Sequence, residues 1–367
     1  MQIKIFFFIA DFKYGGASNA VLSFLKKLNK KIYNCHIIYI GNSDYKKLIP
    51  KNVEIHEVKK RFFFFNTLLS FFEIKKIVNK NINSRDENLF ISNIHYSNIL
   101  SIFFLRNLKN LKIFLFERTS LKELDIFFSL PIYIKNKIIK LLIKKFYLKA
   151  DSIFSNSITV KNELKRIGIK TNVIYSGSLK KILHKKKLNP KKFYKIIAVG
   201  RLTKQKNYEV LIDSVELIYN KNFKLYIYGD GDLFYNLQSQ IIQKKLQKKI
   251  KLMRHENNKN KIYGNADLLV HTSLFEGLPN SIVDAINYSV PVIAFDGYGG
   301  ISEILGNGKY GKLYKKNNKY EISRNIKTFI INPKILQKKI LIGRQILYKF
   351  LSTNATNSLE RQILNNK

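Results

Sequence analysis

Short apolar runs alternate along the whole chain with longer stretches in which apolar residues recur every three or four positions. Continuous short runs are typical of strands buried on both faces, and the wider spacing is typical of amphipathic helices. The expected strands are 3–9, 36–40, 53–58, 89–92, 113–117, 152–156, 172–175, 196–199, 225–228, 250–253, 266–270 and 291–295. The expected helices are 17–30, 66–80, 96–107, 130–149, 158–167, one from about 207, then 232–247, 319–331 and 333–364. This alternation predicts open, mostly parallel sheets with helices on both faces.

The alternation of strand and helix patterns is interrupted around residues 177–195, where lysines and Pro190 stand and few residues are apolar. A chain of 367 residues is longer than one typical core. We therefore expect a first domain over 1–178, a linker over 179–194 and a second domain over 195–346.

Composition narrows the function classes without selecting one. Apolar residues make up 46% of the chain, which excludes disorder, and the single Cys35 excludes a disulfide framework and a cysteine-built zinc site. The net charge of +41 favours contact with nucleic acid, an anionic membrane surface or phosphate-bearing substrates. Because Lys, Asn, Ile, Phe and Tyr all have A/T-rich codons, a biased genome explains the charge equally well.

The N-terminal apolar run is expected to be a strand and not a signal peptide, because it is short and Asp11 and Lys13 follow it. No stretch approaches the ~18 uninterrupted apolar residues of a membrane span. Segments 59–76 and 132–149 mix apolar residues with lysines, which suits either a bilayer surface or packing on the sheet. For 59–76 we weigh the bilayer surface and packing on the sheet equally, and for 132–149 we favour packing on the sheet.

The stretch 272–285 combines the features of an anion site. It follows an apolar strand, turns through glycine and proline, and starts a helix with Asn280 or Ser281 as N-cap. The unpaired N–H groups at such a helix start attract an anion. Glu276 lies in the glycine-proline turn and Asp284 about one helical turn inside the helix. Carboxylates at these places can bind hydroxyl groups next to a phosphate, and a sugar nucleotide has both groups.

Two further loops follow strands in the same way. Arg201 and Lys206 flank the loop after strand 196–199 and suit two neighbouring phosphates, although either residue alone fits a plain basic surface. Gly15 and Gly16 follow the first strand as in a nucleotide-binding loop, but without a full G-x-G-x-x-G motif, so a structural turn is the favoured interpretation.

Taken together, these segments resemble a known family. The segments that carry the resemblance are Val199-Gly200-Arg201-Leu202, Gln205-Lys206-Asn207, Gly229-Asp230-Gly231, Ser273 to Ser281 and Pro291-Val292-Ile293-Ala294. In this order they resemble the family 4 retaining glycosyltransferases (glycosyl transferases group 1), over about 195–314. The N-terminal half is similar more loosely, through Gly15-Gly16, Ala150-Asp151-Ser152 and Ser155-Asn156-Ser157.

The resemblance implies an α/β GT-B fold, with two Rossmann-like domains whose parallel sheets face a central cleft. It implies that the first domain binds the acceptor, that the second binds an NDP-sugar, and that a last helix at about 347–367 packs back on the first domain. By the same match, Arg201 and Lys206 hold the donor diphosphate, Glu276 contacts the sugar and Asp284 binds the ribose. The remaining donor-binding residues implied are Gly15, Gly16, Gly277, Leu278, Pro279, Asn280 and Ser281.

One position departs from the family pattern of two glutamates separated by seven residues, since Asp284 stands where the second glutamate is expected. An aspartate keeps the charge but reaches one methylene less, so the ribose contact is expected to be weaker or water-mediated.

Other polar residues at strand ends have weaker assignments. His95 and Arg118 are candidates for contact with the acceptor or the sugar, and His95 for a part in catalysis, although such residues are more often structural. Asp230 and Asp232 form a D-x-D motif that binds metal in another glycosyltransferase fold. We favour a turn made by Gly229 and Gly231, with Asp232 capping the next helix. No metal and no cofactor is expected, because Arg201 and Lys206 neutralise the diphosphate.

The predicted enzyme is a glycosyltransferase of the hexosyltransferase type. It would move a sugar from an NDP-sugar to a glycan or lipid-linked acceptor, with retention, in bacterial surface polysaccharide synthesis such as lipopolysaccharide or capsule. Its expected place is the cytoplasm or the inner face of the cytoplasmic membrane. The alternatives are another GT-B enzyme, such as a phosphorylase or an NDP-sugar epimerase, and a basic nucleic-acid-binding protein. The last lacks a recognisable motif, and its aromatic residues lie in apolar runs.

Overall fold

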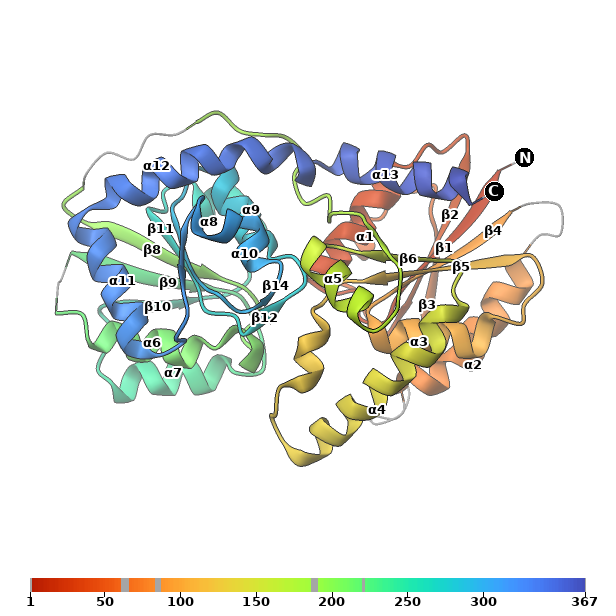
Figure 1. Ribbon diagram of the computed structural model, residues 1–367, viewed down its shortest axis with the longest axis horizontal. Coiled ribbons are helices and arrows are strands. Elements are labelled where there is room, and N and C mark those ends of the chain that lie inside the picture. The colour runs from red at the N-terminus through yellow and green to blue at the C-terminus, as the bar shows by residue number, and fades with distance from the viewer. Residues whose placement is uncertain (1, 61–65, 83–86, 186–190, 220–221, 367) are drawn as a thin grey trace. The chain divides into compact units, whose positions relative to one another are not determined.

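The computed structural model describes residues 2–60, 66–82, 87–185, 191–219 and 222–366 (Figure 1). The chain divides into two units, one formed by Met1–Lys180 with Lys349–Lys367 and the other by Lys181–Tyr348. Each unit is built around one parallel sheet, which confirms the predicted α/β class with two Rossmann-like domains. The division falls at the start of the expected linker, and residues 186–190 of that linker lie outside the described part.

The first unit contains a seven-stranded sheet in the order β3-β2-β1-β4-β5-β6-β7. The strands are β1 (Ile3–Ile9), β2 (Tyr33–Ile40), β3 (Glu54–Val58), β4 (Asn88–Asn93), β5 (Leu111–Glu117), β6 (Ser152–Ser155) and β7 (Asn172–Val173). The helices are α1 (Gly16–Lys27), α2 (Asn66–Asn81), α3 (His95–Leu105), α4 (Leu130–Phe146), α5 (Ile158–Arg166) and α13 (Ser352–Asn365). Alternate residues of β1 separate two cores, with Phe7 packing towards α1 and α13 and Phe8 towards the helices of the other face.

The sequence pattern predicted one helical stretch over 333–364, but the structure divides it into separate helices. Helix α12 (Pro333–Gly343) is followed by a 3-10 segment (Arg344–Phe350), and α13 starts at Ser352. Helix α13 packs on α1 (Figure 1), and Leu359 and Ile363 enter the same core as β1. A Cβ atom on Gly177 would lie 2.7 Å from the Cα of Ser352, so only glycine allows this close approach.

The second unit contains a six-stranded sheet in the order β10-β9-β8-β11-β13-β15. The strands are β8 (Tyr194–Val199), β9 (Phe223–Tyr228), β10 (Ile250–Met253), β11 (Leu268–His271), β13 (Val292–Phe295) and β15 (Lys312–Tyr314), with a separate pair β12 (Phe275–Glu276) and β14 (Tyr298–Gly299). The helices are α6 (Tyr208–Glu216), α7 (Phe234–Gln243), α8 (Lys259–Tyr263), α9 (Asn280–Asn287), α10 (Ile301–Ile304), α11 (Lys319–Ile331) and α12.

Each sheet has one place where the strand order reverses. In the first unit the reversal lies between β1 and β4, and in the second between β8 and β11. The loops after the carboxyl ends of two such strands diverge to opposite faces, which leaves a crevice where open α/β sheets bind ligands. The segments that follow these four strands contain Gly15 and Gly16, His95, Lys206, and Glu276 respectively.

Candidate functional site

In the second unit, hydrogen bonds join the two loops at the reversal point. The amide of Leu274 donates to the carbonyl of Gln205 at 2.9 Å, and the side chain of Gln205 donates to the carbonyl of Phe275 at 2.8 Å. The hydroxyl of Thr272 donates to the carbonyl of Lys206 at 2.6 Å. The loop with Lys206 and the loop with Glu276 therefore form one connected element.

A buried charge pair occupies the centre of this element. Nζ of Lys206 donates to Oε1 of Glu276, and Nε2 of His271 lies 3.4 Å from the same oxygen. Burial alone would raise the pKa of Glu276, but the charge of Lys206 and the bond to His271 outweigh it and hold that pKa well below its usual range. Burial lowers the pKa of His271 despite the carboxylate, so the imidazole is neutral at neutral pH. Glu276 is thus a fixed anion with two donors.

Two glycines allow this arrangement. A Cβ atom on Gly200 would lie 2.8 Å from Cε of Lys206 and 2.9 Å from the hydroxyl of Tyr208. Gly299, at φ +95°, brings β14 against β12 so closely that a Cβ atom would lie 1.5 Å from the carbonyl oxygen of Glu276. Glycine is therefore required at both places for Lys206 and Glu276 to keep their positions.

The loop over 277–281 leads directly into α9. The helix begins at Asn280 with Pro279 as N-cap, so the prediction of Asn280 or Ser281 as N-cap is wrong by at least one residue. No side chain caps the helix, and Oδ1 of Asn280 is buried without a hydrogen-bond partner among the described residues. The start of α9 therefore keeps free donors beside Glu276.

The other two predicted donor contacts differ in their surroundings. The Arg201 side chain is exposed, and the described residues offer it no hydrogen-bond or ion-pair partner. Asp284 is buried within α9, and Nζ of Lys259 lies 2.6 Å from its Oδ1. Burial raises the pKa of Asp284, and Lys259 opposes that shift. The sequence interpretation missed Lys259 because it lies on the short helix α8, for which no pattern was recognised.

The Asp230 motif forms a turn. A Cβ atom on Gly229 would lie 2.0 Å from the carbonyl oxygen of Gly200, so the two loops cross with room for glycine only. The carboxylate of Asp230 accepts bonds from NH1 of Arg254 at 3.1 Å and from the amide of His255 at 3.0 Å. The predicted capping role of Asp232 is wrong, because α7 begins at Phe234 with Leu233 as N-cap.

In the first unit, His95 opens α3 directly after β4. Its Nδ1 lies 3.6 Å from Oε1 of Glu117 and its Nε2 lies 3.2 Å from Oε1 of Glu123. Burial by itself would lower the pKa of His95, but the nearby carboxylates of Glu117 and Glu123 outweigh it and raise the pKa. The preceding Ile94 adopts φ +74°, a strained value for a β-branched residue and one that clusters at functional sites.

Arg118 lies next to this group and is almost fully buried. Its Nε donates to Oδ1 of Asn93 at 2.6 Å, and its guanidinium stacks over Phe116 at 4.6 Å. NH1 and NH2 are buried and have no hydrogen-bond partner among the described residues. Burial lowers the pKa of Arg118 to about 9. A buried guanidinium with two unpaired amino groups suits an anionic or hydroxyl-rich ligand.

Gly15 and Gly16 lie where the sequence places them, at the junction between the loop after β1 and the start of α1. Gly15 is the N-cap of α1, and the helix begins at Gly16 without a side-chain cap. The amide of Tyr14 donates to Oδ2 of Asp44 at 3.1 Å, which fixes the start of this loop.

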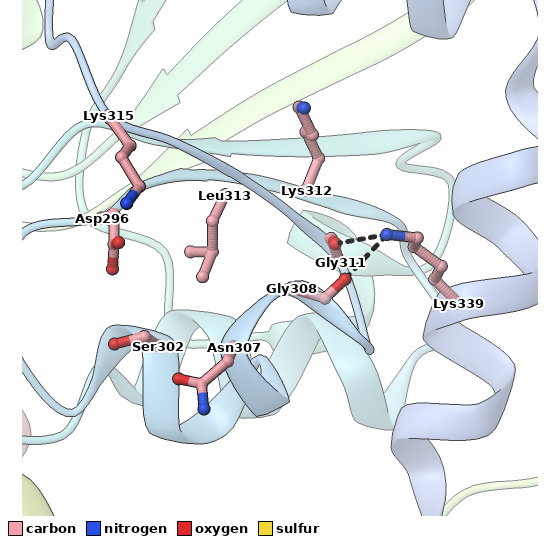
Figure 2. Close-up of a pocket in the computed structure, with 9 residues that line it drawn as sticks. All are labelled: Asp296, Ser302, Asn307, Gly308, Gly311, Lys312, Leu313, Lys315 and Lys339. Atoms are coloured by element: carbon pink, nitrogen blue, oxygen red, sulfur yellow. Dashed lines mark hydrogen bonds between the residues drawn. The ribbon is translucent and has the colours of Figure 1, made fainter.

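A separate hollow in the second unit has a volume of about 510 Å³ (Figure 2). Its lining residues are Asp296, Ser302, Asn307, Gly308, Gly311, Lys312, Leu313, Lys315 and Lys339. Lys339 donates to the carbonyls of Gly308 at 2.7 Å and Gly311 at 3.5 Å, as Figure 2 shows. None of the predicted site residues lines it, so this hollow is distinct from the element around Glu276.

Residues 180–345 match the family model described as Glycosyl transferases group 1. The chain is 31% identical over 160 residues, 42% of this chain and 46% of the relative, to the amylovoran biosynthesis glycosyltransferase AmsD of Erwinia amylovora. It is 28% identical over 215 residues, 55% of this chain and 58% of the relative, to the N-acetylgalactosamine-N,N'-diacetylbacillosaminyl-diphospho-undecaprenol 4-alpha-N-acetylgalactosaminyltransferase of Campylobacter jejuni. The chain thus spans about half the length of these curated relatives.

The fold is shared over the whole chain with solved structures. HepE of Anabaena, crystallised in complex with UDP-glucose, superposes with a TM-score of 0.79 at 17% identity over 99% of each chain. The shared fold confirms the predicted GT-B architecture, and residues 180–345 are similar to glycosyl transferases group 1, as the motifs predicted. Membership of family 4 and the roles of single residues stay predictions. Among the described residues, no helix is both long and apolar enough to cross a membrane.

Proposed function

We propose that this protein is a retaining glycosyltransferase that moves a sugar from a nucleoside diphosphate sugar to a glycan or lipid-linked glycan acceptor. The observation that carries the proposal is the buried Glu276 anion held by Lys206 and His271 beside the open start of α9. A carboxylate accepts hydrogen bonds from sugar hydroxyls, while a lysine and free amides bind a diphosphate, so the element offers both halves of donor recognition.

The relatives support the chemical class of both substrates. The Campylobacter relative is named for a diphospho-undecaprenol compound, the Erwinia relative for amylovoran biosynthesis, and the Anabaena structure contains UDP-glucose. For this chain we infer a nucleotide-sugar donor bound by the second unit and an acceptor bound by residues of the first, with His95 and Arg118 as its polar contacts.

In the proposed reaction the residues bind, orient and neutralise charge. Lys206 and Arg201 hold the diphosphate and stabilise the negative charge that develops on it as the sugar departs. The acceptor hydroxyl attacks from the face that the diphosphate leaves, which retains the configuration, and a diphosphate oxygen takes its proton. Glu276 fixes the sugar ring, and Asp284 with Lys259 orients the ribose side of the donor.

A panel of UDP-, GDP- and other nucleotide sugars tests the proposal, with hydrolysis and transfer followed by product release and the anomeric configuration by NMR. We expect one donor class to turn over with retention, and R201A to lose transfer while the protein stays folded. Inversion of configuration would refute the retaining mechanism. Transfer by R201A at the wild-type rate would refute its place in the donor site.

A second part of the proposal concerns the membrane surface, and it rests on α4. Its buried residues are Ile139 and Ile143, although the sequence favoured packing of the whole apolar side on the sheet. Its exposed apolar residues, with those on either side of it, are Phe127, Leu130, Ile132, Ile134, Ile138, Leu141 and Leu148. Leu141 is 74% exposed, and lysines alternate with these apolar residues along the sequence. Helix α4 lies at the periphery of the first unit (Figure 1).

We infer that α4 lies on an anionic bilayer, where a lipid-linked acceptor is found. Burial of one such side chain contributes roughly 1.5–3 kcal/mol, and each lysine near the surface adds about 1 kcal/mol. Flotation with phosphatidylglycerol vesicles tests this, with L141S expected to reduce binding about tenfold or more, since 1.4 kcal/mol is tenfold. The matched control is I331S, because Ile331 is 82% exposed in the second unit. Equal binding of both variants would refute the role of α4.

A further inference from the structure

A cluster of two histidines and a glutamate lies at the edge of the first sheet, outside the candidate site. His36 belongs to β2, and Glu54 and His56 belong to the edge strand β3, which pairs with β2 in parallel register. His36 is paired with Glu54, and residues two apart on a strand share a face, so all three side chains project from the same side. The sequence alone does not reveal this cluster, because its members come together only through the pairing of β2 with β3.

The three ligand-type atoms converge. Nδ1 of His36 and Nε2 of His56 share a hydrogen bond at 3.0 Å. Oε2 of Glu54 lies 3.4 Å from the His36 nitrogen, and Oε1 lies 3.7 Å from the His56 nitrogen. Two ligand atoms bound 2.0–2.1 Å from a tetrahedral zinc ion lie about 3.3 Å apart. The observed spacing therefore matches zinc coordination after shifts of a few tenths of an ångström.

We propose that His36, Glu54 and His56 form a binding site for a divalent transition-metal ion of the zinc class. Two imidazole nitrogens and a carboxylate oxygen are ligands that zinc takes together, and the fourth position is open to water because Glu54 is 56% exposed. Of the described residues, this is the one group of at least three histidine, cysteine or acidic side chains close enough to hold a metal ion.

The surroundings favour the metal-binding form of the histidines. Burial lowers the pKa of His36 to about 4 and also lowers the pKa of His56, so both rings are neutral at neutral pH and offer a lone pair. Nε2 of His36 has no hydrogen-bond partner among the described residues. The second ring nitrogen of a metal-bound histidine usually donates a hydrogen bond that orients the ring. Because the His36 ring lacks this bond among the described residues, we expect a moderate affinity for zinc.

The position in the fold indicates a structural role for the ion. Glu54 begins β3, so the cluster lies towards the amino end of the strands, whereas His95 follows the carboxyl end of β4. An ion held by both β2 and β3 would tie the edge strand to the sheet. The site needs neither the donor nor the acceptor, so it is independent of the proposed transferase activity.

The test uses the full chain without a histidine tag, freed of metal by a chelator and titrated with zinc chloride by calorimetry. We expect one zinc ion per chain, and a rise of about 5–10 °C in the unfolding midpoint at a hundredfold excess over the dissociation constant. H56Q should bind at least about 10–100-fold more weakly, since loss of an outer partner alone costs that much. E54Q should also weaken binding, and its exposed position leaves the core intact.

The matched control is H184Q, because His184 is exposed and lies in the second unit. It should bind zinc as the wild type does, and circular dichroism checks that each variant is folded. Absence of zinc binding in the wild-type protein would overturn the proposal. Equal stoichiometry and affinity in the wild type, H56Q and E54Q would overturn it as well.

Discussion

Replacing Lys206 by alanine tests the buried charge pair directly. The side chains of Lys206 and Glu276 are 13% and 12% exposed, so the variant leaves a carboxylate inside the protein with neutral His271 as its remaining partner among the described residues. Removing one member of a buried pair costs about 3–5 kcal/mol. For a unit of this size, the unfolding midpoint should fall by about 6–20 °C.

The pH dependence gives the sign of the effect. The pKa of Glu276 is held below its unfolded value, so the pair stabilises the fold above about pH 4.5 and loses this contribution as the pH falls through the folded pKa. The difference between wild type and K206A should therefore be large at pH 7 and shrink below pH 4. Thermal unfolding followed by circular dichroism at several pH values measures it.

The control for this experiment is K204A, because Lys204 is exposed on the same 3-10 turn, residues Lys204–Lys206. A double-mutant cycle of K206A with E276Q should give a coupling of about 2 kcal/mol or more, since the double variant buries no charge. Equal midpoints for K206A and K204A, with a coupling below about 0.5 kcal/mol, would refute the buried pair.

Three further predictions address the surrounding residues. G299A should lower the free energy of unfolding by more than about 3 kcal/mol, because its Cβ atom would overlap the Glu276 carbonyl. The control is G308A, since Gly308 has φ +91° and nothing within 4 Å of the added Cβ atom, and it should cost only about 1–2 kcal/mol. Equal costs in thermal unfolding would show that backbone strain alone matters. Because the pKa of His95 is raised, its contribution to stability should be full below about pH 6.5 and lost as the pH rises through the folded pKa, so H95Q should differ from wild type more at pH 6 than at pH 9. R118K should lower kcat/KM about 10–100-fold with little change in midpoint, since it loses hydrogen bonds to a charged group of about 1.5–3 kcal/mol each; a lower midpoint with unchanged kcat/KM would make Arg118 structural.

Sequence pattern predicted the elements that are long or strongly apolar. The strand over 3–9 and the parallel class follow from continuous apolar runs, and the start of α6 after Asn207 follows from the helical spacing there. The short pair β12 and β14 was not predicted, because two-residue strands leave no periodicity. The break of the last helical stretch over residues 344–351 was missed, although Gly343 before it and Ser352, Thr353 and Asn354 after it are weak helix formers.

The sequence named Lys206 and Glu276 as candidates but did not identify the residues that contact the candidate side chains. Glu276 and Lys206 were found because each follows a strand at a glycine-containing turn. His271 was missed, although it is a polar residue that ends an apolar strand, which is the signal that could have found it. Glu117 and Glu123, which hold His95, belong to later elements, and their approach depends on the order of strands in the sheet.

Asp284 shows why partners matter more than the identity of a single residue. From the sequence, the aspartate appeared to be a shortened glutamate with a weaker reach towards ribose. In the structure Asp284 is buried and forms an ion pair with Lys259 of α8. The charge of the shorter side chain is therefore balanced by this lysine. The pair presents one donor-bearing and one acceptor-bearing group at the same place, and either can bind a hydroxyl. In the proposed donor site, Asp284 therefore acts together with Lys259, and a glutamate at 284 would have to displace Lys259 before it could reach further.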